Sequence, residues 1–227
     1  SSAASDVYKR QMLLTRTFAS YGVEHLKPAV AYVILTVVLL LIFLIVGYPA
    51  FIAVFAHLNP FKFAKKITRV AVFGFSTSSS AATLPLNVKT TVEELGVDEK
   101  IASFVLPLGM TINMNGTAIM QVIATLFIAG CAGYSISFTQ LVVIALLALI
   151  ASAGTPAAPG SGAIILFTIL SGLGYVNDAA MLAYSLILAI NRPIEMLVTA
   201  LNVVGDSATS IYVAKSEGVL NEDVYNA

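Results

Sequence analysis

The segment Leu182–Lys215 reads LAYSLILAINRPIEMLVTALNVVGDSATSIYVAK, and its pattern decides the class of the protein. Its length and apolar content suit a helix that crosses a lipid bilayer, which needs about 20 mostly apolar residues. Polar residues nevertheless recur in it at steps of three or four, which places them on one face of the helix. These residues are Arg192, Glu195, Thr199, Asn202 and Asp206. Since an ionisable group at bilayer depth costs about 2.5–3.5 kcal/mol, this polar face predicts a protein-lined cavity for an ion and a solute.

The composition also indicates a membrane protein. Of the 227 residues, 58% are hydrophobic and only 11% are charged, whereas soluble domains have about 25% charged residues. The net charge of zero gives no support for nucleic-acid binding, and the single cysteine excludes a disulfide framework. Residues 1–11 resemble neither a signal peptide nor the segment that follows. We interpret them as an expression or sequence-assembly remnant and expect the chain to begin partway through a longer protein.

The first long apolar run, Pro28–Phe55, is long enough to cross the membrane once, and we expect it to face lipid. It is followed by NPFKFAKKITR (59–69), which carries four basic residues close to the membrane. The positive-inside rule places this basic loop in the cytoplasm.

Two later stretches predict re-entrant helical hairpins. Val70–Pro85 runs from apolar residues into a tract of small hydroxyl residues, and the chain is charged again soon afterwards. Leu141–Tyr175 has two apolar arms around a tip rich in Gly, Pro, Ser and Ala at 152–162. Neither stretch can hold two full crossings, and irregular backbone at membrane depth is tolerated only where it lines a protein cavity. The alternative for the first, a soluble serine-rich loop, is disfavoured by its apolar flanks.

Between the hairpins, Ile101–Gly130 spans the membrane but carries TINMNGT (111–117) in its middle. Asn and Gly are poor helix formers, so we expect an unwound segment whose backbone carbonyls can coordinate Na⁺. A packed span whose Asn residues bond neighbouring helices is the alternative. A hairpin followed by a polar span occurs twice, and such paired interruptions are typical of transporters built from inverted repeats.

Four motifs in this order resemble the glutamate-transporter family, the dicarboxylate/amino acid:cation symporters. They are SSSAATLP (78–85), NMNGT (113–117), SAGTPAAPGSGA (152–163) and NVVGD (202–206). The resemblance covers residues 21–218 and implies the C-terminal part of an elevator transport domain, an all-α membrane protein with transmembrane helices and two re-entrant hairpins. The implied elements are the sixth span 27–55, hairpin one 59–94, the broken seventh span 101–130, hairpin two 138–175 and the eighth span 179–215. We expect the charged tail, 219–227, to be frayed.

The resemblance implies a sodium-driven symporter and no enzyme, with H⁺ as an alternative coupling ion and no organic cofactor. The implied sodium ligands are Gly109, Asn113 and Asn202 through carbonyls and Asp206 through its carboxylate, with a second set at Thr111, Met114, Ser152, Ala153 and Thr155. Asn115 stands where the family has an Asp of a third sodium site. The implied substrate contacts are Ser78, Ser80, Thr117, Ala158, Gly162, Glu195, Thr199 and Asn202, with Arg192 as a further candidate. The expected partners are the lipid bilayer of the inner (plasma) membrane and two further copies in a homotrimer.

The sequence departs from the acidic-substrate members of this family, which carry Arg at the position of Val198. The polar face sums to minus one, which a single Na⁺ neutralises and a zwitterion leaves unchanged. We therefore predict a neutral or small polar amino acid whose ammonium meets Glu195, with acidic amino acids or C4-dicarboxylates as the alternative. Arg192 either pairs with Glu195, three residues further on, or contacts the substrate. The loss of the Asp at Asn115 predicts fewer coupled sodium ions than in acidic-substrate members.

Two other classes and a restriction remain. An ion channel could also use re-entrant loops, although it would not need a binding face with Glu195. An intramembrane serine protease is disfavoured because no histidine follows Phe63, so a Ser–His pair cannot form there. Without the scaffold spans that precede these elements in the family, this part of the chain is expected to transport nothing by itself.

Overall fold

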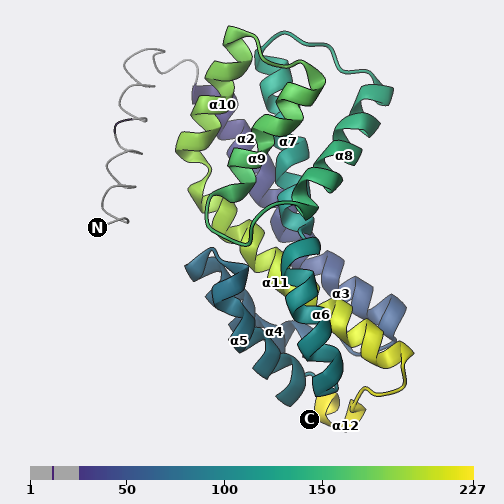
Figure 1. Cartoon of the computed structure of the whole chain (residues 1–227). Coiled ribbons are helices and arrows are strands. Elements are labelled where there is room, and N and C mark those ends of the chain that lie inside the picture. The colour runs from purple at the N-terminus through teal and green to yellow at the C-terminus, as the bar shows by residue number, and fades with distance from the viewer. Residues whose placement is uncertain (1–11, 13–25) are drawn as a thin grey trace.

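The computed structural model describes Met12 and residues 26–227, and within that part every regular element is a helix (Figure 1). The predicted all-α fold class is confirmed. The stretch 1–11, which we interpret as a remnant, lies outside the described residues. Three helical stretches in the described part are long and apolar enough to cross a membrane: Pro28–Ala56, Glu99–Cys131 and Arg192–Ser216.

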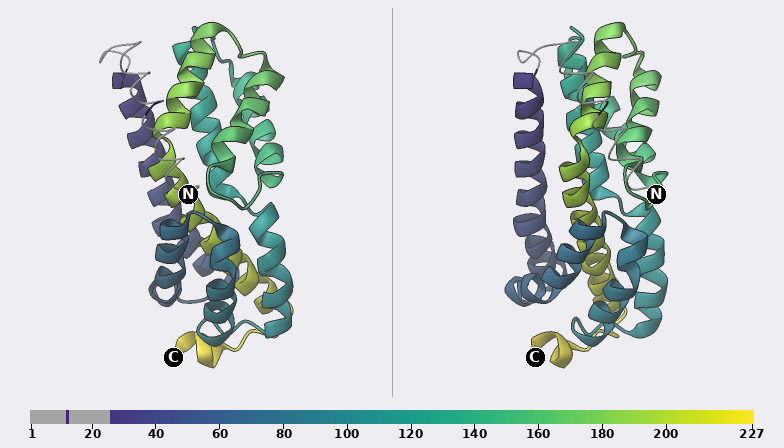
Figure 2. Two further views of the ribbon diagram at one scale, coloured as in Figure 1. Left: turned by 60° about the vertical axis from the view of Figure 1, so that its left-hand side comes forward. Right: turned by 90° about the vertical axis from the view of Figure 1, so that its left-hand side faces the viewer.

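The first apolar segment is an almost continuous helix, and Figure 2 shows its first part running along one side of the molecule. Two π-helical turns flank Pro49, whose nitrogen has no hydrogen to donate and which therefore disturbs the regular ladder. Only 22% of the most apolar window of this segment is buried, so most of its surface suits contact with lipid. Its parts are α2 (Leu26–Ile42), η2 (Phe43–Gly47), α3 (Tyr48–Phe51) and η3 (Ile52–Ala56).

Hairpin one consists of α4 (Pro60–Thr77) and α5 (Ser80–Glu93), joined by a tip of two serines. The side chain of Asn59 starts α4 by accepting hydrogen bonds from its first free backbone N–H groups. At Ser78 a φ of 50° turns the chain out of α4. Ser79 then caps α5 by accepting a backbone N–H at 3.2 Å. Small hydroxyl residues thus supply both the turn and the cap that reverse the chain.

The next span is broken, because two residues separate α6 (Glu99–Ile112) from α7 (Asn115–Cys131). Asn113 (φ −84°, ψ 75°) and Met114 (φ −107°, ψ 49°) leave the helical region. The interruption is shorter than the TINMNGT motif, whose outer residues stay helical. It places the C-terminus of one helix and the N-terminus of another in the middle of the span.

Hairpin two consists of α8 (Phe138–Ala153) and α9 (Ser161–Leu173). Ser137 and Gln140 form a capping box that starts α8, so this arm begins directly after the polar turn. The tip, 154–160, ends at Gly160, whose φ of 86° is a conformation that glycine adopts without strain.

The prediction of one continuous helix from Leu182 to Lys215 is wrong. The structure has α10 (Asp178–Ile190) and α11 (Arg192–Ser216), separated at Asn191. The physical reason is Pro193, which has no N–H to donate and whose ring would clash with a preceding carbonyl inside a helix. It is accommodated in the first turn of α11, where no N–H partner is required. The chain therefore breaks at Asn191, one turn ahead of Glu195.

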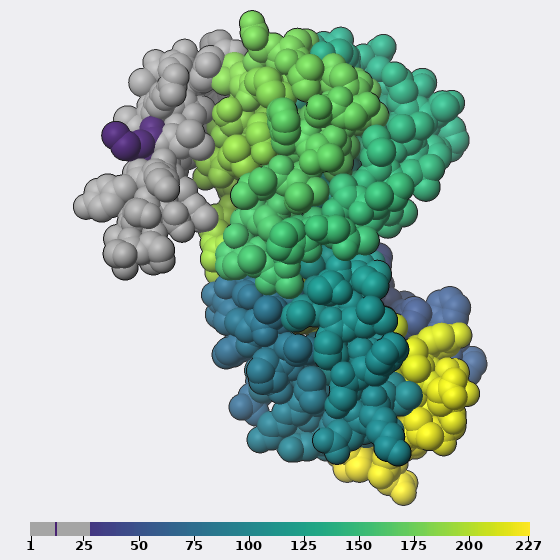
Figure 3. All heavy atoms as spheres, viewed as in Figure 1, coloured from purple at the N-terminus to yellow at the C-terminus, as the bar shows by residue number. Residues whose placement is uncertain are grey.

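Helix α11 forms the centre of the molecule, and both halves of the chain pack around it (Figure 1). Hairpin one is held tightly to it: a Cβ on Gly74 would lie 2.9 Å from Cγ2 of Val203, so only glycine allows this approach. Asn87 of α5 donates from Nδ2 to the carbonyl of Val203 at 3.0 Å and accepts from the hydroxyl of Ser207 at 2.5 Å. Figure 3 shows hairpin two, in green, meeting hairpin one, in blue, at the waist of the molecule.

The expectation of a frayed tail is also wrong. Residues Glu222–Asn226 form a short helix, α12, that docks against the base of hairpin one. Tyr225 is 0% exposed, and its hydroxyl donates to the carbonyl of Asn59 at 2.8 Å. Lys66 donates to the carbonyls of Val224 at 2.8 Å and Tyr225 at 2.9 Å. The buried ring of Tyr225 and the hydrogen bonds from Lys66 therefore hold in place a segment whose charged composition is typical of a disordered tail.

Candidate functional site

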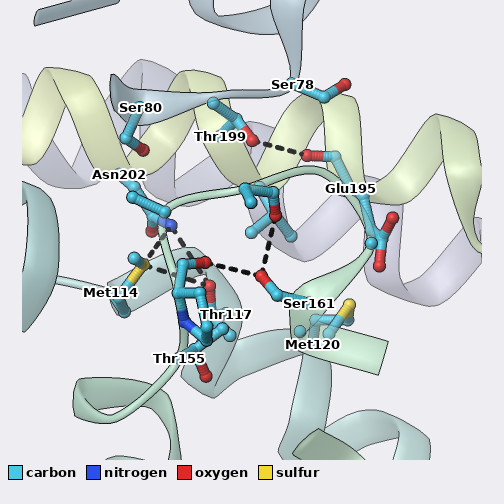
Figure 4. A pocket seen from close by; sticks show the side chains of 16 residues that line it. Ser78, Ser80, Met114, Thr117, Met120, Thr155, Ser161, Glu195, Thr199 and Asn202 are labelled. Carbon is cyan, nitrogen blue, oxygen red and sulfur yellow. Dashed lines mark hydrogen bonds between the residues drawn. The ribbon is translucent and has the colours of Figure 1, made fainter. Parts of the chain in front are cut away.

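A pocket lies where the tips of the two hairpins approach the middle of α11 (Figure 4). Its wall combines both tips, the start of α7 and one face of α11. The tips touch directly, because the hydroxyl of Ser79 donates to the carbonyl of Ala157 at 3.2 Å. The lining residues are Ser78, Ser80, Met114, Thr117, Met120, Thr155, Pro156, Ala157, Ala158, Gly160, Ser161, Gly162, Glu195, Val198, Thr199 and Asn202.

Helix ends of both signs gather around this pocket, because each hairpin and the broken span contribute one N-terminus and one C-terminus. A helix end carries a partial charge of about half an elementary unit, positive at the N-terminus and negative at the C-terminus. The N-termini are those of α5, α7 and α9, which begin at Ser80, Asn115 and Ser161. The C-termini are those of α4, α6 and α8, which end at Thr77, Ile112 and Ala153. The first set suits a carboxylate and the second a cation.

Helix α11 supplies the polar wall of the pocket with Glu195, Thr199 and Asn202, none of which is more than 8% exposed. The hydroxyl of Thr199 donates to the carbonyl of Glu195 at 3.0 Å. Asn202 donates from Nδ2 to the hydroxyl of Thr117 at 3.1 Å and accepts the backbone N–H of Gly116 at 2.8 Å. Asn202 thus ties α11 to the start of α7, and Glu195 is the carboxylate of the pocket (Figure 4).

A second polar group lies one turn further along α11, around Asp206, which is 2% exposed. Asn113 donates from Nδ2 to Oδ1 of this carboxylate at 2.9 Å. The backbone of Gly109 passes so close that a Cβ there would lie 2.6 Å from the same oxygen. The Asp206 group therefore brings two of the implied sodium ligands, Gly109 and Asn113, beside a third, the buried Asp206 carboxylate.

The chemistry of the Asp206 group suits a hard monovalent cation. Within the described part of the chain, no three His, Cys, Asp or Glu side chains come together, so one carboxylate would be completed by amide and carbonyl oxygens. A carboxylate buried in an apolar protein core is costly unless a positive charge accompanies it. Nearby, Asn115 donates from Nδ2 to the hydroxyl of Tyr48 at 3.2 Å, so its amide already has a protein partner.

The second implied sodium set is more dispersed. Met114 and Thr155 both line the pocket, and Ser152 lies buried one turn before Thr155. Thr111 and Ala153 are exposed. The hydroxyls of Thr111, Ser152 and Thr155 each donate to a carbonyl of the preceding turn.

All the implied substrate residues line the pocket except Arg192. Arg192 is the first residue of α11 and is half-buried outside that lining. Val198, which stands where acidic-substrate members carry Arg, also lines the pocket. The reason is its position three residues after Glu195 and four before Asn202, which turns it toward the same side.

The sequence analysis did not predict several residues of the pocket and of the Asp206 group. Met120 lines the pocket three residues after Thr117 on α7, and this spacing could have indicated it. Pro156 and Ala157 also line the pocket, and they directly precede the stretch around Ala158–Gly162 that the resemblance implied. Tyr48 reaches Asn115 across 67 positions of sequence, and no local pattern indicates that contact.

Comparison with known proteins points to one family. The model of the sodium:dicarboxylate symporter family matches residues 11–216. Excitatory amino acid transporter 1 of Rattus norvegicus is 35% identical over 176 residues, which are 78% of this chain and 32% of that protein. Excitatory amino acid transporter 2 of Homo sapiens is 37% identical over 162 residues, 70% of this chain and 28% of that protein. An excitatory amino acid transporter of Caenorhabditis elegans is 35% identical over 164 residues, 72% of this chain and 32% of that protein.

The chain thus spans about a third of the length of these relatives. The relatives are transporters, and on that ground the prediction that the chain is no enzyme is confirmed. The match over residues 11–216 includes both hairpins, the broken span and α11 with its polar face. The chain therefore belongs to the sodium:dicarboxylate symporter family.

Proposed function

We propose that the chain forms the ion- and substrate-binding part of a sodium-coupled symporter for small amino acids, with neutral or small polar ones preferred. One Na⁺ binds at the Asp206 carboxylate, completed by carbonyls of Gly109, Asn113 and Asn202. The amino acid binds in the pocket between the hairpin tips, with its ammonium at Glu195.

The charge of the pocket carries this proposal. Its described lining contains the carboxylate of Glu195 and no Lys, Arg or His. A second carboxylate on the substrate would lie in a largely buried pocket beside Glu195 without a cationic partner. Burying an unpaired charge costs roughly several kcal/mol, and this lining therefore favours a zwitterion over an acidic amino acid or a dicarboxylate.

The α-carboxylate has its own partners. The N-termini of α5 and α9 lie at the two tips, and their free N–H groups and positive ends suit an anion. The hydroxyls of Ser78 and Ser80 line the same side. Thr199 and Thr117 complete the polar surroundings of the amino acid.

Coupling to sodium follows from the charges. With Na⁺ at Asp206 and a zwitterion at Glu195, each cation moved inward gains about 2.3 kcal/mol per 100 mV of membrane potential. The hydrogen bond between Asn115 and Tyr48 supports a smaller number of coupled sodium ions, because a neutral amide bonded to a phenol replaces an acidic ligand. We propose elevator alternating access in a homotrimer of the plasma membrane for the intact protein, with H⁺ as the alternative coupling ion and no organic cofactor.

A symporter of acidic amino acids or C4-dicarboxylates is the second candidate. The relatives are named excitatory amino acid transporters and the family is named for dicarboxylates, and both names favour this candidate. The absence of a cation from the described pocket lining weighs against it. An ion channel is a third class, and accumulation of substrate against a gradient separates it from a symporter.

Uptake by the intact transporter in proteoliposomes tests the proposal. With an inward sodium gradient we expect accumulation of radiolabelled serine, alanine and threonine, and no accumulation of malate. Replacement of external sodium by choline is the control and should abolish uptake. Accumulation of aspartate or malate in preference to serine would contradict the substrate, and equal uptake in choline would contradict sodium coupling.

A further inference from the structure

We propose that Met120 determines the largest substrate side chain that the pocket accepts, and that Asn191 is the positioning residue that holds Met120 in place. This inference rests on the proposed function, because it assigns one end of the same pocket.

The thioether of Met120 lies between the pocket and the tip of hairpin two. Met120 is 1% exposed and lines the pocket (Figure 4). Its Cε lies 3.1 Å from the place where a Cβ of Gly162 would be. The end of this side chain therefore lies close to the backbone of the first turn of α9, directly after the tip.

A buried chain of hydrogen bonds fixes Met120 from behind. Asn191, 1% exposed, donates from Nδ2 to the sulfur of Met120 at 3.1 Å. The hydroxyl of Tyr32, 2% exposed, donates to Oδ1 of Asn191 at 2.8 Å and so fixes the orientation of that amide. Neither Asn191 nor Tyr32 belongs to the pocket lining. Methionine has three rotatable side-chain bonds and adopts many conformations. The hydrogen bond from Asn191 therefore holds the Met120 side chain in one conformation at the pocket wall.

Asn191, at the break between α10 and α11, supports two parts of the pocket wall. Asn191 is the single residue between the two helices, and its backbone keeps a helical conformation there (φ −73°, ψ −11°). Its carbonyl accepts the backbone N–H of Glu195 at 3.0 Å. The same residue thus starts the turn that carries Glu195 and holds the thioether of Met120.

Met120 meets the side chain of the substrate rather than its charged groups. The ammonium belongs at Glu195, and the carboxylate belongs at the hairpin tips with their helix N-termini and serines. Outside the two hairpins, the apolar residues of the lining are Met114, Met120 and Val198. A side chain of one carbon, as in alanine or serine, fits against this surface, and a β-branched one, as in threonine or valine, presses against Met120 and binds more weakly.

The test compares binding of a larger and a smaller amino acid of one series by the intact transporter in saturating sodium. The measured quantity is the ratio of the valine affinity to the alanine affinity, by competition or calorimetry. Met120→Ala should raise this ratio at least about tenfold, since one methylene in a tight pocket is worth that much. Asn191→Leu should raise it about threefold by releasing Met120. Gly162→Ala should lower it, because the added Cβ pushes Met120 toward the substrate.

Ile119→Ala is the matched control, since Ile119 precedes Met120 on α7 and does not line the pocket. It should leave the ratio unchanged. An unchanged ratio in Met120→Ala, or an equal shift in Ile119→Ala, would overturn the assignment of Met120. A change of overall affinity without a change of ratio in Asn191→Leu would overturn the positioning role. If the wild type binds aspartate and not alanine, the proposed substrate class fails, and the glutamate-to-aspartate ratio in the same variants still decides the role of Met120.

Discussion

Replacing Asp206 by asparagine is expected to abolish the sodium dependence of amino-acid binding. Asp206 is 2% exposed and its carboxylate has the amide of Asn113 as a neutral neighbour, so a bound cation is its natural counter-charge. A full charge about 4 Å from a cation contributes about 4 kcal/mol at an effective dielectric constant of 20. The affinity for Na⁺ should therefore fall at least about a hundredfold, which sodium titrations of the melting temperature with serine present can measure.

Asp178→Asn provides the matched control for this variant. Asp178 is an exposed residue in the first turn of α10, away from the pocket lining, and its replacement should leave the sodium response unchanged. A wild-type sodium response in Asp206→Asn would remove Asp206 from the ion site. If acid pH instead of sodium promotes serine binding to the wild type, and Asp206→Asn abolishes that response, the coupling ion is H⁺.

Replacing Glu195 by glutamine is expected to weaken amino-acid binding strongly without changing its dependence on sodium. Glu195 is the carboxylate of the pocket, and glutamine keeps its size while removing the charge that meets the ammonium. A hydrogen bond to a charged group contributes about 1.5–3 kcal/mol, so the affinity for serine should fall roughly 10- to 150-fold. Competition against a radiolabelled amino acid in saturating sodium measures this loss.

If Glu195 binds the ammonium, Glu195→Gln should lose affinity only for ligands that carry an ammonium, whereas loss of a structural residue would weaken the binding of every ligand. Glycerate is serine with a neutral hydroxyl in place of the ammonium, and its weak binding should not fall in Glu195→Gln. The control is Glu217→Gln, just after the end of α11, where the side chain is exposed. Undiminished serine binding by Glu195→Gln, or an equal loss for glycerate, would show that Glu195 does not hold the ammonium.

The sequence was most informative about residues that are energetically costly inside a membrane unless the protein provides partners for them. Glu195, Thr199, Asn202 and Asp206 stand out because polar side chains in an apolar helix need partners, and their periodicity shows that they share a face. The tips of the hairpins stand out for a related reason, since irregular backbone in an apolar segment needs a protein cavity. In the structure, both tips and the first three of these residues line one pocket.

Other features could not be predicted because their causes lie far apart in the chain. Tyr225 is an isolated aromatic residue in a charged tail, and only the fold brings it to Asn59. Met120 looks like an ordinary core residue until Asn191 is placed behind it. A proline such as Pro193 can either kink a continuous helix or lie in the first turn of a new helix, and these two outcomes place the break before α11 differently. The first turn of a helix accepts proline without loss, and the sequence alone does not show that Asn191 has partners there.

The central claim is that one pocket and its neighbouring carboxylate bind a cation and a small zwitterion together. Calorimetric titration of the intact transporter with serine, at several sodium concentrations, tests it most directly. Because binding free energies are reciprocal, sodium must raise the serine affinity by the factor by which serine raises the sodium affinity. The account predicts no measurable serine binding in choline, binding that strengthens with sodium, and weaker binding of aspartate. Serine affinity that is equal in choline and in sodium, or aspartate that binds more tightly than serine, would contradict it.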